Sequence, residues 1–447
     1  MISKYRQMRV MKFGGTSVGS PQRMKDVAKL ITDGKRKVVV LSAMSGTTNS
    51  LVEISDYMKK RNFESANAMI NRLRIKYLQH VEELYSTDEM KAKTRKFLED
   101  EFMYLHSFSS SNYDDTVEKA ILAQGEIIST NMVTNYLLEC GVKVVLVPAL
   151  DYMLIDEDKE PQMKPIKDYW TALLDREPDT EIFLTQGFIC RNTNGEIDNL
   201  QRGGSDYTAS LIGAAMRMEE IQIWTDIDGM HNNDPRFVEG TTPVRQLNFE
   251  EAAELAYFGA KILHPTCIQP ARYAGVPVRL LNTMDPSAPG TLINNKMVKG
   301  QIKAIAAKDN ITCIKIVSSR MLLATGFLRN VFEIFEKYKT SIDMVATSEV
   351  GVSMSIDNVS RLTPIVEELK KCGTVVVDRN LCIICVVGDL KGDNKGFEST
   401  ITSAFENVPI RMISYGGSEH NISFLIDQKN KEEALKSLSA KLFSKTK

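Results

Sequence analysis

The chain has no apolar run long enough for a signal peptide or a membrane span. Its N-terminal stretch MISKYRQMRV is interrupted by charged side chains. No later run approaches the roughly 20 consecutive apolar residues that a spanning helix needs. We therefore expect a cytoplasmic protein that has no membrane partner.

An excess of charge of either sign is also absent. The 56 lysine and arginine residues are balanced by 57 aspartate and glutamate residues, which leaves a formal net charge of −1. The basic residues are spread along the chain instead of gathered in blocks, so the electrostatic footprint of a nucleic-acid-binding protein is missing. We expect small molecules as partners, and no nucleic acid.

Cysteines are few, and they show no pairing. The 7 cysteines are odd in number and scattered, as expected for reduced thiols in a cytosolic protein. Cys382 and Cys385 form a C-x-x-C motif within LCIICVVG, which has the pattern of a strand. Residues three positions apart in a strand point to opposite faces. We therefore predict no metal site there, and we assign none elsewhere.

The sequence does contain a regular alternation of predicted strands and helices. A length of 447 residues suggests two or three domains. Over the first two thirds, apolar runs alternate with helical patterns, which favours an α/β sheet covered on both faces. Ser20 and Pro21 predict the start of one helix, and Gly141 the end of another that contains Glu126. The strands that we expect are residues 10–13, 37–43, 143–149, 181–189 and 221–226.

The last third contains an internal repeat of roughly 70 residues. ITCIKIVSS, GFLRNVFEIFEKYKTSIDM and TSEVGVSMSID are followed by LCIICVVGD, GFESTITSAFENVPIRM and GGSEHNISFLID. Each copy has the pattern strand, helix, strand, strand, so we expect two ferredoxin-like βαββαβ units. The stretch QIKAIAAK can supply the opening strand of the second.

Two loops place a cation against a pair of glycines. Lys12 ends a predicted strand just before Gly14 and Gly15, and NLQRGGSDYTAS places Arg202 before two further glycines and Asp206. Glycines let backbone N–H groups approach a ligand closely, which suits a phosphate. The spacing is neither G-x-x-x-x-G-K-[ST] nor G-x-G-x-x-G. Each loop alone is also compatible with a strand-end turn that carries a solvated cation.

Further polar residues follow the predicted strand 221–226, in IWTDIDGMHNNDPR, at the end of a strand where open α/β sheets bind ligands. Lys261 lies in the otherwise apolar segment ELAYFGAKILHP, although a lysine in such a pattern can also extend to solvent. Lys12, Arg202 and Lys261, with Asp206 to hold them, suit phosphoryl transfer, in which catalysis is positioning and charge stabilisation. No histidine or nucleophile arrangement is evident. That fits a carboxylate acceptor, whose pKa near ~4 makes a general base unnecessary.

Six motifs of the sequence together resemble those of a known family. KFGGTSVGS, VVVLSAMSGTTNSL, QGEIIST, RGGSDYTA, IWTDIDGMHNNDPR and ELAYFGAKILHP, in this order, resemble the aspartate kinases of the amino acid kinase family. The final third resembles the tandem ACT domains of the same enzymes, of the lysine-sensitive type. The resemblance covers essentially the whole chain.

The resemblance implies a fold, a reaction and a domain order. It implies an amino acid kinase domain with a central, mostly parallel sheet over residues 1–297. Two ACT domains follow over 309–380 and 381–447, and strand 300–308 is a candidate part of the second. It implies phosphorylation of the β-carboxylate of L-aspartate by ATP with Mg²⁺, the first step towards lysine, threonine and methionine. No homoserine dehydrogenase segment follows in the sequence, so we expect a monofunctional enzyme.

The resemblance also implies site residues. The lysines that stabilise the transferring phosphoryl group match Lys12 and Lys261, and the acid that organises them matches Asp206. Substrate contacts match Ser42, Thr48, Glu126, Arg202, Gly203, Gly204 and Ser205, with Glu126 on the α-amino group and Arg202 on the carboxylate. Nucleotide contacts match Lys12, Gly14, Gly15, Thr16, Thr225, Asp226, His231, Arg236 and Lys261. His231 departs from the pattern, because many relatives have tyrosine there.

An effector site for L-lysine in the ACT domains is implied as well. It matches Met321, Gly326, Phe327, Leu328, Ser341, Ile342, Asp343, Thr347, Ser348 and Glu349. Asp343 and Glu349 are suitable anions for the two ammonium groups of lysine, although both are also compatible with solvated loop acids. ACT ligands commonly bind across a subunit interface, so a homodimer or a dimer of dimers through the ACT domains is expected.

Two other functions stay open on the sequence. One is an amino acid kinase that phosphorylates glutamate, carbamate or a nucleotide, against which the ACT repeat and RGGSDYTA argue. The other is a lysine sensor that has lost its catalytic activity, against which the intact Lys12, Arg202, Asp206 and Lys261 argue. Turnover of aspartate, as opposed to lysine binding without turnover, separates them.

Overall fold

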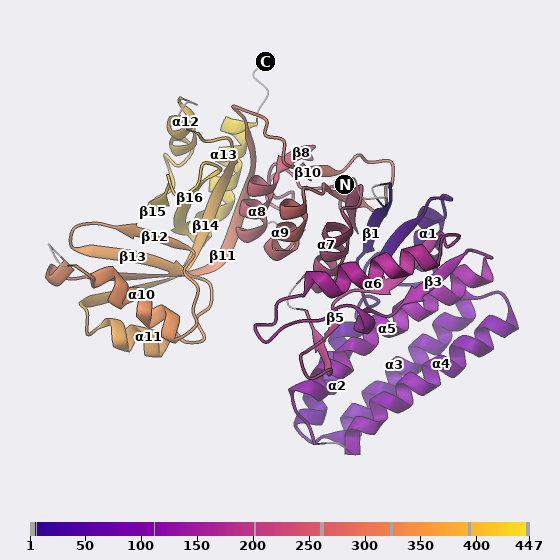
Figure 1. Ribbon diagram of the computed structural model, residues 1–447. Coiled ribbons are helices and arrows are strands. Elements are labelled where there is room, and N and C mark those ends of the chain that lie inside the picture. The colour runs from indigo at the N-terminus through magenta and orange to yellow at the C-terminus, as the bar shows by residue number, and fades with distance from the viewer. Residues whose placement is uncertain are drawn as a thin grey trace. The chain divides into compact units, whose positions relative to one another are not determined.

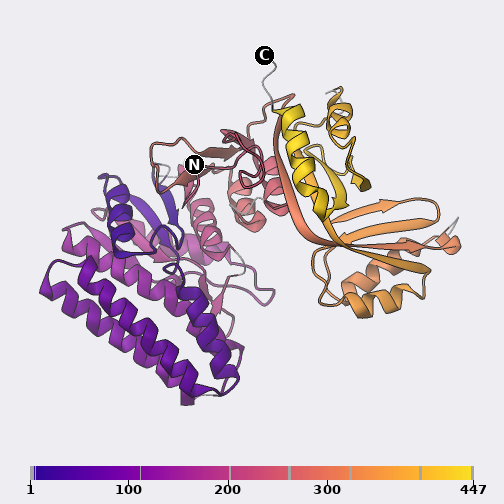
Figure 2. The ribbon, with the colours of Figure 1, turned by 180° about the vertical axis from the view of Figure 1, so that it is seen from behind.

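Residues 231–261 belong with the C-terminal part of the chain and not with the strands that precede and follow them in sequence. The computed structural model describes residues 5, 7–110, 112–200, 203–259, 263–321, 325–391 and 395–443. The first of its two units comprises Met1–Met230 and Ile262–Asn295, and the second His231–Lys261 and Lys296–Lys447. Figures 1 and 2 show the elements of each unit from opposite sides.

The sheet of the first unit is mostly parallel, as predicted. Within this unit the strand order is β3-β4-β2-β1-β7-β9-β10. All neighbours run parallel except β9 and β10, which are antiparallel. The strands are β1 (Arg9–Phe13), β2 (Lys37–Leu41), β3 (Val144–Val147), β4 (Ile182–Gln186), β7 (Glu220–Thr225), β9 (Val278–Asn282) and β10 (Thr291–Asn294).

The sheet has a crevice at its centre. The chain passes from β1 to β2 on one side, whereas β7, the other neighbour of β1, is followed in the sheet by β9 on the opposite side. Connections that leave two adjacent parallel strands in opposite directions open a crevice at their carboxyl ends, where α/β sheets bind ligands. The glycine loop that follows β1 begins at this point.

Both faces of this sheet are covered by helices. On one face, Phe13 and Leu41 join the core formed with α1 (Pro21–Ile31) and α5 (Asp115–Glu139). On the other, α7 (Gly204–Met216) packs so closely that a Cβ atom at Gly213 would lie 2.3 Å from the side chain of Ile221. Helix α7 in turn contacts α6 (Met163–Arg176) and α9 (Pro265–Ala274). Double coverage explains why the strands are continuous apolar runs.

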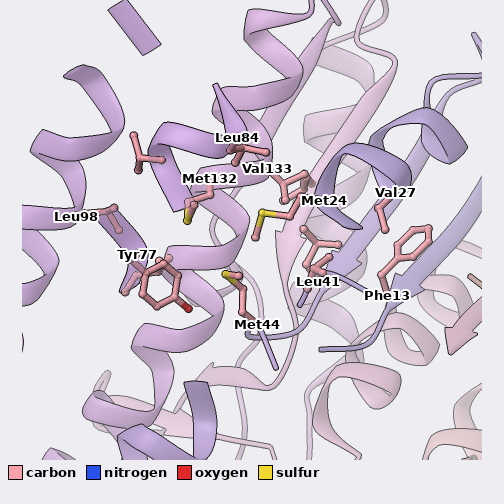
Figure 3. Packing of buried hydrophobic residues seen from close by; sticks show 14 of the residues in the cluster. Phe13, Met24, Val27, Leu41, Met44, Tyr77, Leu84, Leu98, Met132 and Val133 are labelled. Atoms are coloured by element: carbon pink, nitrogen blue, oxygen red, sulfur yellow. The ribbon is translucent and has the colours of Figure 1, made fainter. Parts of the chain in front are cut away.

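The long charged stretch after β2 forms helices that extend the core of the first unit. They are α2 (Thr47–Lys59), α3 (Phe63–Leu84) and α4 (Asp88–Ser107), and both views show α3 and α4 side by side (Figures 1 and 2). Figure 3 shows Tyr77 and Leu84 of α3 and Leu98 of α4 in one cluster with Met132 of α5. This cluster anchors α5, the helix that carries Glu126.

Local capping explains where helices α1 and α5 begin. The side chain of Ser20 accepts a hydrogen bond from the backbone N–H of Arg23, with Pro21 at the first helical position, which confirms the predicted start of α1. Asp114 caps α5 through the N–H of Val117 in the same way. Gly141, with φ of 74°, follows the end of α5 as predicted.

The expected strand 181–189 is wrong in its extent. Strand β4 ends at Gln186, and the chain then turns into β5 (Ile189–Arg191), which pairs antiparallel with β6 (Ile197–Asn199). Phe188 has φ of 69°. Its N–H donates to Oγ1 of Thr208, and its carbonyl accepts from the N–H of Leu200 at 2.7 Å. A left-handed aromatic residue interrupts a strand, and its conformation has no signature in the sequence.

The second unit contains one antiparallel sheet of 6 strands in the order β12-β13-β11-β14-β16-β15. Residues 302–308 of β11 pair with 383–388 of β14, and residues 311–317 pair with 374–381. Residues 302–308, which precede the first repeat, therefore supply a strand segment beside the second repeat, whereas residues 374–380 close the first repeat on its own strand. The strands are β11 (Ile302–Val317), β12 (Met344–Thr347), β13 (Gly351–Ile356), β14 (Thr374–Gly388), β15 (Ile410–Ser414) and β16 (Asn421–Asp427).

The predicted pattern of strand, helix, strand, strand is confirmed in both repeats. Helices α10 (Phe327–Lys337) and α11 (Leu362–Leu369) bury one cluster, which includes Ile314 and Ile365. Helices α12 (Phe397–Ser403) and α13 (Lys431–Leu442) bury another, which includes Phe424 and Leu435. No helix within the described residues is apolar over enough of its length to cross a membrane.

Residues 231–259 are held to the rest of the second unit by close backbone contacts. The carbonyl of Asn232 accepts from the N–H of Ile305 at 2.9 Å. Gly259, which follows α8 (Phe249–Tyr257), lies so close to β11 that a Cβ atom there would be 2.2 Å from the carbonyl oxygen of Ala307. Its φ of 116° also favours glycine. These contacts explain why the division into units does not follow the boundary at residue 297 that the sequence suggests.

Candidate functional site

A buried ion pair lies at the crevice of the first unit. Lys12 is on β1, and its Nζ atom lies 2.6 Å from Oδ1 of Asp206, in the first turn of α7. Both side chains are mostly buried, with exposures of 11% and 13%. The ammonium group is therefore fixed in orientation by a carboxylate and is partly withdrawn from water, which strengthens its field on an anion placed nearby.

The two glycines before Asp206 allow α7 to begin here. Gly203 precedes the helix with φ of 79°, and a Cβ atom there would lie 2.6 Å from Cβ of His264. A Cβ atom at Gly204 would lie 2.7 Å from the ring of Phe188. Side chains at either position would collide with their neighbours, so the sequence GG is required by space at both and by backbone conformation at the first.

Glu126 approaches the same crevice from α5. Its carboxylate accepts a hydrogen bond from the backbone N–H of Ala43 at 3.1 Å, and 5% of the residue is exposed. Burial raises the pKa of Glu126 to about 7, against the opposing effects of the Ala43 hydrogen bond and the charge of Lys12. Gly125 permits this approach, because a Cβ atom there would lie 2.7 Å from Cβ of Ala43.

These residues line one cavity of about 380 Å³. Of the positions expected from the sequence, it brings together Lys12, Gly15, Ser42, Thr48, Glu126, Gly203, Gly204, Ser205 and Asp206. It also includes six positions that the sequence reasoning did not assign, namely Ala43, Met44, Ser45, Gly46, Asn49 and Phe188. Ser45 and Asn49 lie within the quoted motif around residues 38–51, so the motif could have suggested them.

Phe188 could not have been found from the sequence. It reaches the cavity only because β4 ends early and the chain turns at φ of 69°. Met44 contributes to the buried core of the first unit. The ring of Phe188 is thus the large apolar group offered to the cavity by its described lining. A bulky residue in the left-handed region costs about 1–3 kcal/mol, a strain that is concentrated at functional sites.

The expected nucleotide contacts are divided between the units. Thr225 ends β7, where its Oγ1 accepts from the N–H of Ile227, and Asp226 follows it in the first unit. His231 and Arg236 lie in the second unit. The ring of His231 is hydrogen-bonded to Oγ1 of Thr241 at 2.9 Å.

Arg236 is engaged within its own loop. Its guanidinium group forms a two-pronged contact with Asp234, with N···O distances of 2.9 and 2.6 Å, and it is 66% exposed. An anionic ligand would have to compete with Asp234 for this group. Arg202 and Lys261, two further residues expected at the site, lie outside the described residues.

The expected effector residues lie in the first repeat of the second unit. Gly326 precedes α10 with φ of 85°, and Phe327 and Leu328 open the helix. The other positions are Met321, Ser341, Ile342, Asp343, Thr347, Ser348 and Glu349, around β12 and the ends of its neighbours. Glu349 is exposed, whereas the carboxylate of Asp343 is buried and bound to Lys308 at 2.8 Å.

The described side chains offer no group of three or more histidine, cysteine, aspartate or glutamate residues that could hold a metal ion. Cys382 and Cys385 are fully buried free thiols of β14, and burial raises the pKa of both. What the cavity does offer is a fixed cation, a buried carboxylate and glycines at which a ligand can approach the backbone closely. Such a set can hold a small zwitterion and stabilise negative charge on a group in transfer.

Comparison with known proteins agrees with this geometry. Residues 7–282 match the amino acid kinase family, and residues 384–442 match the ACT domain. Aspartokinase 1 of Arabidopsis thaliana chloroplasts is 34% identical over 97% of this chain and 80% of its own length. Lysine-sensitive aspartokinase 3 of Escherichia coli is 31% identical over 97% of this chain and 99% of its own length.

Solved structures agree as well. Aspartokinase III of Escherichia coli, in complex with aspartate and ADP, superposes with a TM-score of 0.84 at 29% identity, over 98% of this chain and 100% of that one. The same enzyme with lysine and aspartate gives a TM-score of 0.80 at 30% identity and the same coverage. Fold, cavity and matches together define an amino acid kinase that carries ACT domains. The chain belongs to the aspartokinases of this family.

Proposed function

We propose that this aspartokinase transfers the γ-phosphoryl group of ATP to the β-carboxylate of L-aspartate, which yields 4-phospho-L-aspartate and ADP. The observation that carries the proposal is a single cavity lined by the Lys12–Asp206 pair and by Glu126. The Escherichia coli relative, solved with aspartate and ADP, supports the same pair of ligands.

Glu126 would bind the α-ammonium group of the substrate. A carboxylate whose pKa is about 7 in the free protein becomes fully ionised when a cation binds beside it. Arg202 would bind the α-carboxylate through a two-pronged contact, and Ser42, Thr48 and Ser205 would hold the remaining oxygens. These contacts would leave the β-carboxylate directed towards the nucleotide.

Lys12 would stabilise the phosphoryl group in transfer, together with Lys261. Phosphoryl transfer requires positioning and cationic stabilisation of the equatorial oxygens. The acceptor is already an anion at neutral pH, because its pKa lies near ~4, so no side chain has to remove a proton. Asp206 acts through Lys12, as a positioning residue. Repulsion between acceptor and nucleotide would be offset by the cations of the site.

The nucleotide would bind as its magnesium complex. The backbone at Gly14, Gly15 and Thr16 would approach its phosphates, because the loop follows β1 at the crevice. Thr225 and Asp226, at the end of β7, would contact the nucleoside with His231, Arg236 and Lys261. When bound, Mg²⁺ supplies charge neutralisation between the phosphates and the acceptor.

L-Lysine would inhibit the enzyme from the ACT domains, where Ser341, Asp343 and Glu349 would bind it. The lysine complex of the Escherichia coli relative supports this effector. We retain residues 1–297 as the catalytic domain and 309–380 and 381–447 as the ACT domains, which would form a homodimer or a dimer of dimers. The reaction would be the first step towards lysine, threonine and methionine, in the cytoplasm.

The two competing interpretations are weaker. The relatives reported above are aspartokinases, which disfavours glutamate, carbamate or a nucleotide as acceptor. A lysine sensor without activity would have no need for the buried Lys12–Asp206 pair, because withdrawing two charges from water costs free energy and apolar side chains could replace them.

The test is formation of aspartyl hydroxamate from L-aspartate, MgATP and hydroxylamine, with and without millimolar L-lysine. We expect product in proportion to enzyme, and less of it when lysine is added. The variant Lys12→Met should be inactive. Lys119→Met is the matched control, because it removes another lysine paired with an aspartate, Asp198 at 2.7 Å, outside the cavity lining. No product from aspartate, with lysine still bound, would favour the sensor.

A further inference from the structure

Asp343, whose carboxylate is expected to bind the effector, already forms an ion pair with a lysine of the chain itself. Nζ of Lys308, on β11, lies 2.8 Å from Oδ1 of Asp343 and 2.9 Å from Oδ2 of Asp357. The hydroxyl group of Tyr257, at the end of α8, donates to the same Oδ1 of Asp343 at 2.8 Å. Nζ also lies 4.5 Å from the ring centroid of Tyr257, in the range of a cation–π contact. All four residues belong to the second unit.

This arrangement has the features of a ligand site. The side chain of Asp343 is 1% exposed, and that of Lys308 is 18% exposed. The second carboxylate oxygen of Asp343, Oδ2, is buried and has no hydrogen-bond partner among the described residues. Two anions, an aromatic face and a hydroxyl group surround one ammonium group. Proteins that recognise ammonium ligands use the same combination of groups.

The electrostatics agree with an occupied cation site. Burial raises the pKa of Asp343, although the hydrogen bonds from Lys308 and Tyr257 oppose the rise. Burial alone would lower the pKa of Lys308, but the hydrogen bonds and charges of Asp343 and Asp357 outweigh it, so the net change is upward. Lys308 therefore remains an ammonium ion, and removing it would leave a buried carboxylate without a counterion.

We propose that Asp343, Asp357 and Tyr257 form a site for a primary alkylammonium group, and that Lys308 is its resident ligand, which an effector amine must displace. The proposal rests on the proposed regulation by L-lysine, whose ε- or α-ammonium group would take the place of Lys308. The affinity for the effector then depends on the difference between two free energies, that of the effector amine bound to Asp343 and that of Lys308 bound to the same carboxylate. Lys308 sets that affinity without contacting the effector.

The first experiment measures L-lysine binding to the full chain by calorimetry. Lys308→Met keeps the length and apolar stem of the side chain but removes the charge, and it should tighten the Kd by about ten-fold, which corresponds to about 1.4 kcal/mol. Lys308→Arg keeps a competing cation and should not tighten it. Lys431→Met is the matched control, because Lys431 is similarly paired, 2.7 Å from Asp309 and 4.2 Å from the ring of Phe237, in the same unit. Its affinity for lysine should equal that of the wild type.

Equal or weaker lysine binding by folded Lys308→Met would overturn the proposal, because Lys308 would then be a structural partner of Asp343. Failure of the wild type to bind lysine would instead refute the proposed regulation.

A second measurement tests whether the site binds an alkylammonium group, even if the wild type does not bind lysine. Propylammonium replaces the atoms that Lys308→Ala removes, and 100 mM propylammonium chloride should raise the Tm of this variant by roughly 2 °C or more relative to tetramethylammonium chloride. The wild type and Lys431→Ala should show no such difference. Lack of this rescue would also overturn the proposal.

Discussion

Nζ of Lys12 and Oδ1 of Asp206 lie 2.6 Å apart, although one lies near the end of the N-terminal strand and the other in the first turn of a helix in the middle of the chain. Their contact joins the glycine loop after β1 to the glycine loop before α7. Both residues line the cavity with Glu126. The pair therefore places a fixed positive charge at the crevice of the sheet, where phosphoryl transfer requires one.

Removal of this charge should abolish turnover. We expect Lys12→Met to lower kcat by about 10²–10³ or more, because preorganised cationic stabilisation of the phosphoryl group is lost. Asp206→Asn should lower kcat less, since it misplaces the ammonium group without removing it. Steady-state kinetics by the hydroxamate assay measure both, and calorimetry should show unchanged L-lysine binding. Near-normal turnover of Lys12→Met would refute the role of the loop after β1.

Glu126 should make aspartate binding dependent on pH. Its pKa of about 7 means that the free protein must lose a proton to bind the substrate ammonium group when the pH lies below 7. The KM for aspartate should therefore rise as the pH falls through about 7, while the KM for ATP stays nearly constant. Glu126→Gln should raise the KM at pH 8 and flatten the profile. An unchanged profile in the variant would assign the ammonium group to another residue.

The same residue should affect stability with a defined sign. The folded protein raises the pKa of Glu126 above its ordinary value of 4.5, so between pH 4.5 and about 7 the unfolded chain releases the proton more readily. The stability that the protonated carboxyl group of Glu126 contributes is therefore lost as the pH rises from 4.5 to about 7. We expect the change in the free energy of unfolding caused by Glu126→Gln to be more favourable at pH 8.5 than at pH 4.5, by about 1–3 kcal/mol. Urea denaturation of both proteins at both pH values measures it. A larger gain at the lower pH would contradict this sign.

Gly203 should tolerate alanine less well than a glycine of equal backbone conformation. Gly203 and Gly195 both have φ of 79°, but a Cβ atom at Gly195 meets nothing within 4 Å, whereas at Gly203 it would lie 2.6 Å from His264. Gly195→Ala should cost about 1 kcal/mol of stability with full activity. Gly203→Ala should cost about 1–3 kcal/mol more and lose activity, because α7 must shift. Equal effects in thermal unfolding would show that only the backbone conformation matters.

Phe188 should restrict the length of the substrate. Its ring is the large apolar group of the described cavity lining, and aspartate has one methylene between its carboxylates, whereas glutamate has two. Phe188→Gly removes the ring and also relieves the left-handed backbone strain, so folding is preserved. We expect the ratio of kcat/KM for aspartate over glutamate to fall by about ten-fold. An equal loss with both substrates would indicate a purely structural residue.

Glu349 should act in regulation and not in turnover. It is exposed between β12 and β13, among the residues expected to bind the effector. Glu349→Ala should keep basal activity and abolish inhibition by L-lysine, since an ammonium partner is lost. Glu333→Ala is the control, because it removes an exposed acid of α10 that is paired with Arg329 at 2.7 Å. Inhibition that persists in Glu349→Ala would require a different anion for the effector.

Local rules of the sequence predicted much of the fold. Ser20 and Pro21 specify a helix start through a side-chain cap and a preset φ, which need only neighbouring residues. Short continuous apolar runs predicted the strands of the first unit in the same way. Strand 181–189 was wrong because a left-handed Phe188 is stabilised by Thr208 and Leu200, which lie elsewhere in the chain. Residues 231–259 pack on β11 for a similarly non-local reason.

The sequence by itself determined which chemical groups the site would contain. Motif order identified the family, and the glycine pairs at residues 14–15 and 203–204 predicted close approach to a ligand, because such features are local and independent of packing. Only the tertiary structure decided which groups meet. It paired Lys12 with Asp206, raised the pKa of Glu126 by burial, and placed Lys308 on Asp343. These outcomes depend on distance and desolvation between residues remote in sequence, and no pattern along the chain encodes either quantity.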